Sequence, residues 1–264
     1  MNRRFDLSVI IVSWNVRKLL DECLVSVEKS VEGLMAEIFV VDNASTDGSA
    51  QMVAECHPGV RLIANADNRG FGRANNEALR ICQARYALIL NPDTLVTPAA
   101  IQKMYKFMEA HPQAALAAPE QCDQYGNLNL MNMARILPRE MAESLIEQAL
   151  SLGQPRTRLI FTQARQIAFV NAACWIVRMD AMEQIGLFNE DLFLYGEEKD
   201  VCGRLKQAGW QIWFLRDVQI VHYRHQSLGQ RGLIQDLLFH GQSKIFRMIR
   251  DLHLKQFPSF SFVN

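Results

Sequence analysis

Residues 7–15 read LSVIIVSWN, an apolar and largely β-branched run that ends in polar side chains. Such a run predicts a buried strand. Similar apolar runs occupy residues 37–41, 60–64 and 86–90, and each run is followed by a stretch with helical periodicity. Apolar strands separated by helices indicate a parallel sheet covered on both faces, because a helix must return the chain between parallel strands. The first half therefore predicts a doubly wound α/β fold.

The second half predicts a continuation of this sheet. A Met-rich and Leu-rich stretch, residues 120–165, has the character of an insertion. The elements expected beyond it are strand 168–177, helix 180–185, helix 199–209, and strands 212–215 and 218–221. Because no linker or repeat separates the two halves, we expect one unit, residues 1–229, made of halves 1–119 and 120–229 and followed by an amphipathic helical tail, residues 230–264.

Two sites carry signals typical of helix starts. Ser45 precedes Asp47 and Ser49, and Thr97-Pro98 combines an N-cap residue with a proline suited to the first helical position. Both pairs predict that a helix begins there.

Composition excludes several classes of protein. The 28 basic and 28 acidic residues cancel, so no global positive field indicates nucleic acid binding. The six cysteines include no Cys-x-x-Cys pair and are interpreted as reduced core thiols of a cytosolic protein. The apolar run after residue 6 is too short for a signal peptide or a membrane span.

Polar clusters follow four consecutive predicted strands. Ligands of open parallel sheets bind beyond the carboxyl ends of the strands. An aspartate at one such position is usually a turn former, but the recurrence indicates a site. A hard cation such as Mg²⁺ or Mn²⁺ needs few protein carboxylates when phosphate oxygens complete its shell, so Asp93 of Asn91-Pro92-Asp93 suffices to seat a metal diphosphate. Asp42 is placed to accept the ring N–H of a pyrimidine base.

The segment 68–76, NRGFGRANN, offers two glycines and two arginines. A dinucleotide fingerprint is disfavoured because Asn75 stands at the third glycine position and the segment follows the third strand. We expect Gly70 and Gly72 to let the backbone approach a ligand while Arg69 or Arg73 supplies charge to it. A plain turn with solvated arginines is the alternative.

A second cluster combines Glu197, Glu198 and Asp200 at a predicted helix start. Acidic residues there complement the helix dipole, which is their structural interpretation. The chemical interpretation takes Glu198 as a base that removes a proton from an acceptor hydroxyl. His222, which follows an apolar strand, is a candidate co-ligand of the cation.

Taken in order, these motifs resemble family 2 glycosyltransferases with the GT-A fold, and most closely the bacterial rhamnosyltransferase-like branch. The resemblance extends to about residue 227. It implies a Rossmann-like, mostly parallel sheet flanked by helices, with Asp93 and His222 as metal ligands and Glu198 as the catalytic base. The family's Glu-Asp-x-Asp motif reads Glu197-Glu198-Lys199-Asp200 here. The residues expected to bind the nucleotide sugar are Ser13, Asn15, Asp42, Asn68, Gly70, Arg73, Asn91 and Asp93.

The resemblance implies an inverting transfer, from a nucleoside diphosphate sugar, to a hydroxyl of a glycan or polyprenol-linked saccharide in cell-envelope synthesis. The expected donor is dTDP-L-rhamnose and the expected cofactor Mg²⁺ or Mn²⁺. The alternative is a non-catalytic nucleotide or carbohydrate binding module, because Glu198 replaces the family's aspartate. An NAD-dependent oxidoreductase is disfavoured, since the first turn lacks glycines.

The sequence of residues 230–264 predicts a helix and also indicates where in the cell the protein is located. Its apolar residues, spaced three or four apart with lysines and arginines between them, fit a core-packing helix or one lying on an anionic membrane. We expect a cytoplasmic protein, or one held peripherally on the cytoplasmic face of the inner membrane.

Overall fold

The computed structural model describes residues 3–126, 164–193 and 196–223. Its strands are β1 (Phe5–Ser13), β2 (Ala36–Asp42), β3 (Val60–Ala64), β4 (Ala84–Leu90), β5 (Thr94–Val96), β6 (Ala114–Cys122), β7 (Arg165–Ile167), β8 (Cys174–Arg178) and β9 (Gln211–His222). Its helices are α1 (Arg17–Ser30), α2 (Ser49–Cys56), α3 (Phe71–Leu79), α4 (Ala100–Ala110), α7 (Met179–Gln184) and α8 (Glu197–Gln207).

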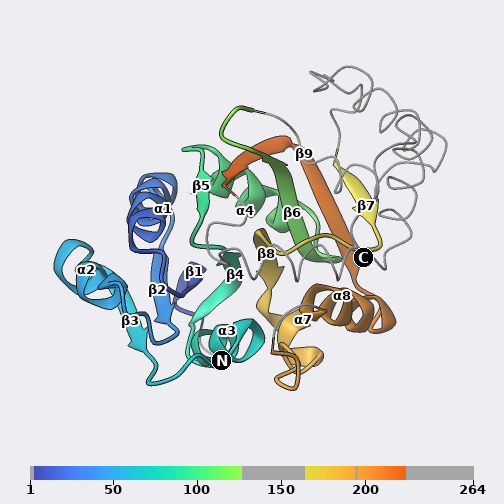
Figure 1. Cartoon of the computed structure of the whole chain (residues 1–264). Helices are drawn as coiled ribbons and strands as arrows, with labels where there is room; N and C mark the ends of the chain where they lie inside the picture. Colours follow the sequence, from blue (N-terminus) through green and yellow to red (C-terminus); the bar gives the residue numbers. More distant parts are fainter. Residues whose placement is uncertain (1–2, 127–163, 194–195, 224–264) are drawn as a thin grey trace, which may run out of the picture.

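All the described strands join one sheet, ordered β3-β2-β1-β4-β8-β6-β9-β5, with β7 also paired to β9 (Figure 1). The four strands from β3 to β4 are parallel, and β8 lies antiparallel between β4 and β6. Because β6 and β9 are parallel to each other, β1, β2, β4, β6 and β9 all end at the same edge. The predicted mixed α/β fold with a mostly parallel sheet is confirmed, and that shared edge is where polar side chains can meet.

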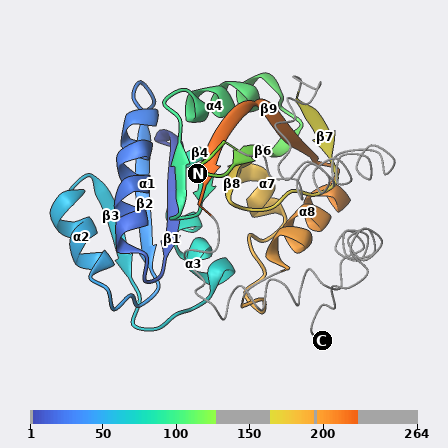
Figure 2. The same ribbon diagram turned by 45° about the horizontal axis from the view of Figure 1, so that its top comes forward.

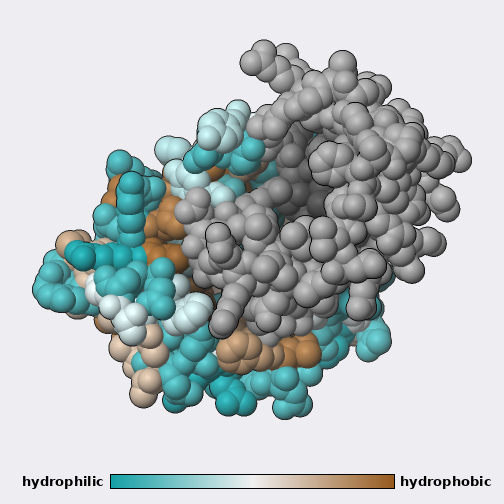
Figure 3. Space-filling model, viewed as in Figure 1, coloured by the Kyte–Doolittle hydropathy of each residue, from teal (hydrophilic) through white to brown (hydrophobic). Residues whose placement is uncertain are grey.

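Helices cover both faces of the sheet (Figure 2). Side chains of α1, α2 and α4 enter one hydrophobic core, and side chains of α3, α7 and α8 enter the other. In α1 the buried residues recur every three or four positions, at Leu20, Cys23, Leu24 and Val27. Full burial of a leucine-sized side chain contributes about 1.5–3 kcal/mol, so these faces anchor the helices to the sheet. Hydrophilic side chains dominate the outer surface over α2 (Figure 3).

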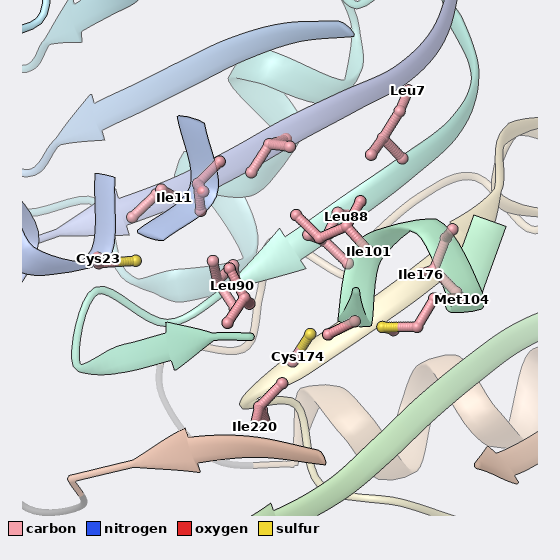
Figure 4. Packing of buried hydrophobic residues seen from close by; sticks show 14 of the residues in the cluster. Leu7, Ile11, Cys23, Leu88, Leu90, Ile101, Met104, Cys174, Ile176 and Ile220 are labelled. Atoms are coloured by element: carbon pink, nitrogen blue, oxygen red, sulfur yellow. The ribbon is translucent and has the colours of Figure 1, made fainter. Parts of the chain in front are cut away.

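The first core extends directly beneath the polar edge. Figure 4 shows Leu90 of β4 close to Cys174 of β8 and Ile220 of β9, with Cys23 of α1 on the adjoining side. Five of the six cysteines are buried and all six are free thiols, whereas Cys56 is exposed. The prediction of core thiols therefore holds for every cysteine except Cys56.

Both predicted helix starts were wrong by a few residues. The helix expected near Ser45 begins at Ser49 after Gly48, because the Asp47 carboxylate accepts a hydrogen bond from the Ser49 backbone N–H (3.0 Å). The helix expected at Thr97 begins at Ala100, and the Thr97 carbonyl accepts from the Ala100 N–H (2.9 Å). In both places an intervening turn precedes the helix.

The strand predictions of the second half also needed correction. Of the expected strand 168–177, only the last residues form a strand, β8, which is inserted between β4 and β6. Residues 168–173 connect it to β7, a short strand that ends at Ile167 and pairs with β9. The two strands expected at 212–215 and 218–221 are a single strand, β9, interrupted by a register shift against β6. The alanine-rich β6 itself was not predicted, because alanine is a weak strand former.

The expected division between residues 119 and 120 falls within β6. The tail, residues 230–264, and most of the expected insertion lie outside the described residues. No helix in the described part of the chain is long and apolar enough to cross a membrane.

Candidate active site

Ser13 and Asp42 lie side by side at the polar edge, as partners in the β1–β2 register. Both side chains are buried. One Asp42 oxygen, Oδ2, accepts a hydrogen bond from the Ser45 backbone N–H at 2.9 Å. The other oxygen and the Ser13 hydroxyl have no hydrogen-bond partner within the described residues. Since an unsatisfied buried polar group costs about 1–3 kcal/mol, these two atoms mark unused bonding capacity at the edge.

Asn15 joins the loop after β1 to the loop after β2. Its backbone adopts a left-handed conformation (φ 54°), its N–H donates to Ser45 Oγ (2.9 Å), and its Oδ1 accepts from the Thr46 N–H (2.7 Å). The Asp47 carboxylate accepts from the Arg17 N–H at 2.8 Å. Burial raises the pKa of Asp47, but hydrogen bonds from Ser49 and Arg17 outweigh it and lower that pKa overall. Asn15 is therefore held in place by the chain.

Asp93 and His222 meet at the same edge because β5 pairs with β9, which sets Thr94 opposite His222. Asp93 Oδ1 lies 3.2 Å from His222 Nε2, yet it forms no hydrogen bond within the described residues, and neither does His222 Nδ1. Adjacent ligands of an octahedral cation with bonds near 2.1 Å lie about 3.0 Å apart. The two side chains thus fit one cation, with room left for phosphate oxygens. No group of three or more candidate metal ligands occurs in the described ranges.

Asn91 is fixed through its backbone. Its N–H donates to the Ala173 carbonyl at 2.9 Å, and its carbonyl oxygen lies 3.8 Å from Cys23 Sγ. Asp93 is fixed in the same way, since its carbonyl accepts from the Tyr223 N–H at 2.9 Å. The loop that carries Asp93 is therefore held by β8 and by the end of β9.

The glycine segment packs closely against another part of the chain, and its predicted approach to a ligand stays a prediction. A side chain at Gly70 (φ 80°) would overlap the carbonyl oxygen of Phe193, and one at Gly72 would press on Phe188 and Asn189. Asn68 Oδ1 accepts from the Gly70 N–H at 3.0 Å. This segment is thus a docking point for residues 188–193.

The two arginines of this segment also have partners in the chain. Arg73 faces Glu190 at 3.5 Å, and Arg69 pairs with Glu77 at 2.9 Å. Neither guanidinium is an uncommitted charge, although both are close to half exposed.

The acidic cluster opens α8, immediately after Gly196 (φ 104°). Glu197 is buried and Glu198 is partly exposed. Asp200 forms an ion pair with Arg204, one turn further along α8, and accepts from its Nε at 2.9 Å. Glu198 and Asp200 are thus the partly exposed acids of the three, and Asp200 is committed to the ion pair with Arg204.

A cavity of about 580 Å³ lies between the start of α1 and the ends of β6 and β9, and Asn15, Arg17, Asp47, Gln124 and Tyr223 contribute to its lining. Trp14 belongs to the polar cluster predicted after the first strand, and it is 43% exposed directly after Ser13, the register partner of Asp42. One further residue of this edge was not predicted from the sequence. Glu120 is buried near the end of β6, and the failure to predict that strand concealed it.

Comparison with known proteins identifies relatives. The sequence model described as Glycosyl transferase family 2 matches residues 8–186. The chain is 26% identical to the N-acetylglucosaminyl-diphospho-decaprenol L-rhamnosyltransferase of Mycobacterium tuberculosis, over 91% of this chain and 83% of that protein. It is 23% identical to the low-salt glycan biosynthesis hexosyltransferase Agl10 of Haloferax volcanii, over 82% and 67% of the two chains.

Solved structures share the fold. The mannosyltransferase PcManGT of Pyrobaculum calidifontis, in complex with GDP-Man and Mn²⁺, superposes with a TM-score of 0.64 at 20% identity, over 95% of this chain and 70% of that one. Residues 1–349 of TarS from S. aureus, in complex with UDP, give a TM-score of 0.58 at 17% identity, over 94% and 65%.

Proposed function

The chain belongs to glycosyl transferase family 2 and is a glycosyltransferase, and we propose that Asp93 and His222 seat the divalent cation on which its nucleotide-sugar donor depends. The observation that carries this proposal is their pairing at 3.2 Å, with bonding capacity left on both side chains. A bound Mg²⁺ or Mn²⁺ neutralises charge on the departing nucleoside diphosphate. The Mn²⁺ complex of PcManGT supports a cation on the same fold.

Asp42 and Trp14 are proposed to bind the nucleobase. One buried Asp42 oxygen has no partner within the described residues, and the exposed Trp14 follows Ser13, the register partner of Asp42. A base stacked on the indole could donate a ring N–H to this carboxylate. Stacking a base on an aromatic ring is worth about 1–3 kcal/mol. Asn15 supports this pocket by tying the loop that carries Trp14 to the loop after Asp42.

Glu198 is proposed as the general base. It removes the proton from the acceptor hydroxyl as that oxygen bonds to the anomeric carbon. The bond from this carbon to the phosphate oxygen breaks, and its electron pair leaves with the diphosphate. A single displacement of this kind inverts the anomeric centre and forms no covalent enzyme intermediate.

We propose L-rhamnose from dTDP-L-rhamnose as the donor sugar and a polyprenol diphosphate-linked saccharide as the acceptor. The mycobacterial relative supports both choices, since its name specifies a rhamnosyl transfer to a decaprenol-linked sugar. Peripheral membrane contact through residues 230–264 rests on a segment outside the described ranges and stays a prediction.

The test is a transfer assay that follows product mass. The chain is incubated with Mn²⁺, N-acetylglucosaminyl diphosphoryl polyprenol and, in separate reactions, dTDP-L-rhamnose, UDP-GlcNAc and GDP-mannose. A product heavier by one deoxyhexose supports the full proposal, and one carrying another sugar corrects the donor alone. Nucleotide binding without transfer or donor hydrolysis would instead indicate the non-catalytic binding module.

A further inference from the structure

Besides Asp42 and Asp93, a further buried acid lies at the carboxyl edge of the sheet and takes no part in the mechanism above. Glu120, near the end of β6, is 1% exposed. Its nearest charged neighbour is Arg216 of β9, whose Nε lies 3.3 Å from Oε2. Neither carboxylate oxygen of Glu120 has a hydrogen-bond partner in the described part of the chain, and the same is true of Arg216 Nε. The pair is therefore buried with much of its bonding capacity unused.

Glu37 shows what a purely structural version of this pair looks like. It lies 6% exposed near the opposite edge of the sheet and pairs with Arg61 at 2.9 Å. Arg61 bonds Oε2, and the other oxygen, Oε1, accepts from both the Ser8 hydroxyl and the Gln83 backbone N–H at 2.7 Å. Burial of a carboxylate is tolerated when hydrogen bonds satisfy its oxygens, as they do at Glu37, whose Arg61 partner is itself half exposed. Glu120 lacks such bonds, although both pairs belong to the same sheet.

The local backbone directs Glu120 toward the acceptor half. The register between β6 and β9 shifts between Pro119 and Glu120, so that Arg216 lies in a bulge of β9. Bulges commonly re-aim a side chain beside an active site. Side chains alternate along a strand, and Ala118 belongs to the core formed with α8, so Glu120 lies on the α8 face of β6. Glu198, the proposed base, lies in the first turn of that helix. β6 and β9 run side by side in Figure 1, with α8 next to β9.

On the basis of the proposed function, we propose that Glu120, held by Arg216, binds hydroxyl groups of a sugar ring during transfer. A carboxylate offers two oxygens to neighbouring hydroxyls, and a guanidinium on its other side keeps it oriented. The sugar is that of the donor or that of the acceptor, since both carry the same recognisable hydroxyls.

The ionisation of Glu120 agrees with this assignment. Burial raises its pKa to about 7, against the lowering effects of the Arg216 charge and the Gln121 backbone N–H. Near neutral pH both forms are populated. The ionised form accepts hydrogen bonds from hydroxyls, and the protonated form also donates one.

The test compares Glu120→Gln with the matched control Glu37→Gln in the full chain. Calorimetry measures the affinity, with Mn²⁺, for dTDP, UDP and GDP and for dTDP-L-rhamnose, UDP-GlcNAc and GDP-mannose. Kinetics measures KM for N-acetylglucosaminyl diphosphoryl polyprenol.

We expect Glu120→Gln to leave affinity for the bare nucleotide unchanged. The substitution should either lower the affinity for the nucleotide sugar that the wild type binds or raise KM for the acceptor, in each case by about 10-fold to 100-fold. The first result assigns the donor sugar and the second the acceptor sugar. Glu37→Gln is expected to change neither.

Thermal unfolding provides the structural readout. Glu37→Gln and Glu120→Gln should both lower Tm, because each removes the charge paired with an arginine. The loss should be larger for Glu120→Gln, since Arg216 is buried whereas Arg61 is half exposed. Glu120→Asp, which keeps the charge but shortens its reach, should fold and show an intermediate sugar affinity. Unchanged sugar-nucleotide affinity together with unchanged acceptor KM overturns the inference, whatever happens to Tm. If the wild-type chain binds no nucleotide and no sugar nucleotide, both the proposed function and the inference are overturned. This outcome is read from the wild type alone, without any variant.

Discussion

Asp93 and His222 illustrate how single residues define this site. Each is common as a structural residue, and only the antiparallel pairing of β5 with β9 brings them together. A carboxylate oxygen and an imidazole nitrogen at 3.2 Å that form no hydrogen bond are poorly explained as a stabilising contact. Their positions are better explained if both atoms are ligands of one cation.

The first prediction concerns Asp93→Asn. An amide oxygen is a weak ligand for a hard cation, and metal stabilisation of a leaving phosphate is worth several kcal/mol. Transfer should therefore fall at least about 100-fold, on the order of 3 kcal/mol. Steady-state rates measured across a Mn²⁺ titration check this. Rates that match the wild type at every Mn²⁺ concentration would contradict the assignment.

The second prediction separates the acids of α8. Glu198→Gln should lower kcat by about 10²-fold to 10⁴-fold, the usual contribution of a general base. Asp200→Asn is the matched control, because Asp200 is paired with Arg204 and its loss should affect stability more than kcat. Single-turnover transfer rates of both variants decide the matter. Equal losses of kcat in the two would remove the distinction between these acids.

Sequence patterns located the residues that follow the early strands but not the contacts those residues make. Asp42 and Asp93 were identifiable because each follows an apolar run. The contact of Gly70 with Phe193 was not predictable, since no local pattern reveals that Phe193 occupies the space beside it. Glu120 carried no signal, because its isolation depends on a bulge in a distant strand.

At the scale of elements, α3 supports the loop that leads into the acidic helix. Asn76 of α3 exchanges two buried hydrogen bonds with the Phe188 backbone, at 2.9 and 3.0 Å. The Phe71 N–H donates to the Phe193 carbonyl at 3.2 Å. These contacts fix residues 188–193 and hence the approach to Glu198.

The third prediction tests this support with two glycines at positive φ. Gly70 and Gly186 both have φ 80°, but only Gly70 has Phe193 against it, whereas Gly186 faces open space. Alanine at either site should lower the free energy of unfolding by at least about 1–2 kcal/mol from backbone strain, and by more at Gly70, whose ψ of 173° is open almost only to glycine. Only Gly70→Ala should also lower kcat, because it displaces the segment leading to Glu198. Equal kcat values in the two variants would argue against that coupling.

The fourth prediction concerns the junction of α1 and α2. The buried His57 ring bonds Asp21 at 2.9 Å through Nε2 and Glu28 at 3.0 Å through Nδ1. Burial lowers the pKa of His57, but the two carboxylates outweigh it, so its pKa is raised. Its contribution to stability is therefore complete below the unfolded-state pKa of about 6.5 and is lost as pH rises through the higher folded-state pKa.

His57→Gln should consequently destabilise the chain by about 1–2 kcal/mol near pH 6 and by less at alkaline pH. Urea denaturation of both proteins at a series of pH values measures the difference. A wild-type advantage that stays constant across the series would show that protonation of His57 is not its source.

At the scale of the whole molecule, the alternation of apolar strands and helices was enough to predict a parallel sheet covered on both faces. The antiparallel insertion of β8 was not predictable, because strand order depends on long-range pairing that no local pattern records. That insertion brings β6 and β9 to the edge where β1, β2 and β4 end, and so joins the first half of the chain to the acidic helix. The functional site is a property of this complete sheet.

The central claim is that Asp93 and His222 hold the cation on which donor binding depends. Its most direct test is the shift in Tm produced by dTDP, UDP and GDP with and without Mn²⁺, in the wild type and in Asp93→Asn and His222→Gln. We expect one nucleotide to raise the wild-type Tm strongly only with Mn²⁺, and both variants to lose that Mn²⁺-dependent increase while keeping their metal-free Tm. A nucleotide-induced shift of the same size in all three proteins, independent of Mn²⁺, would contradict the account.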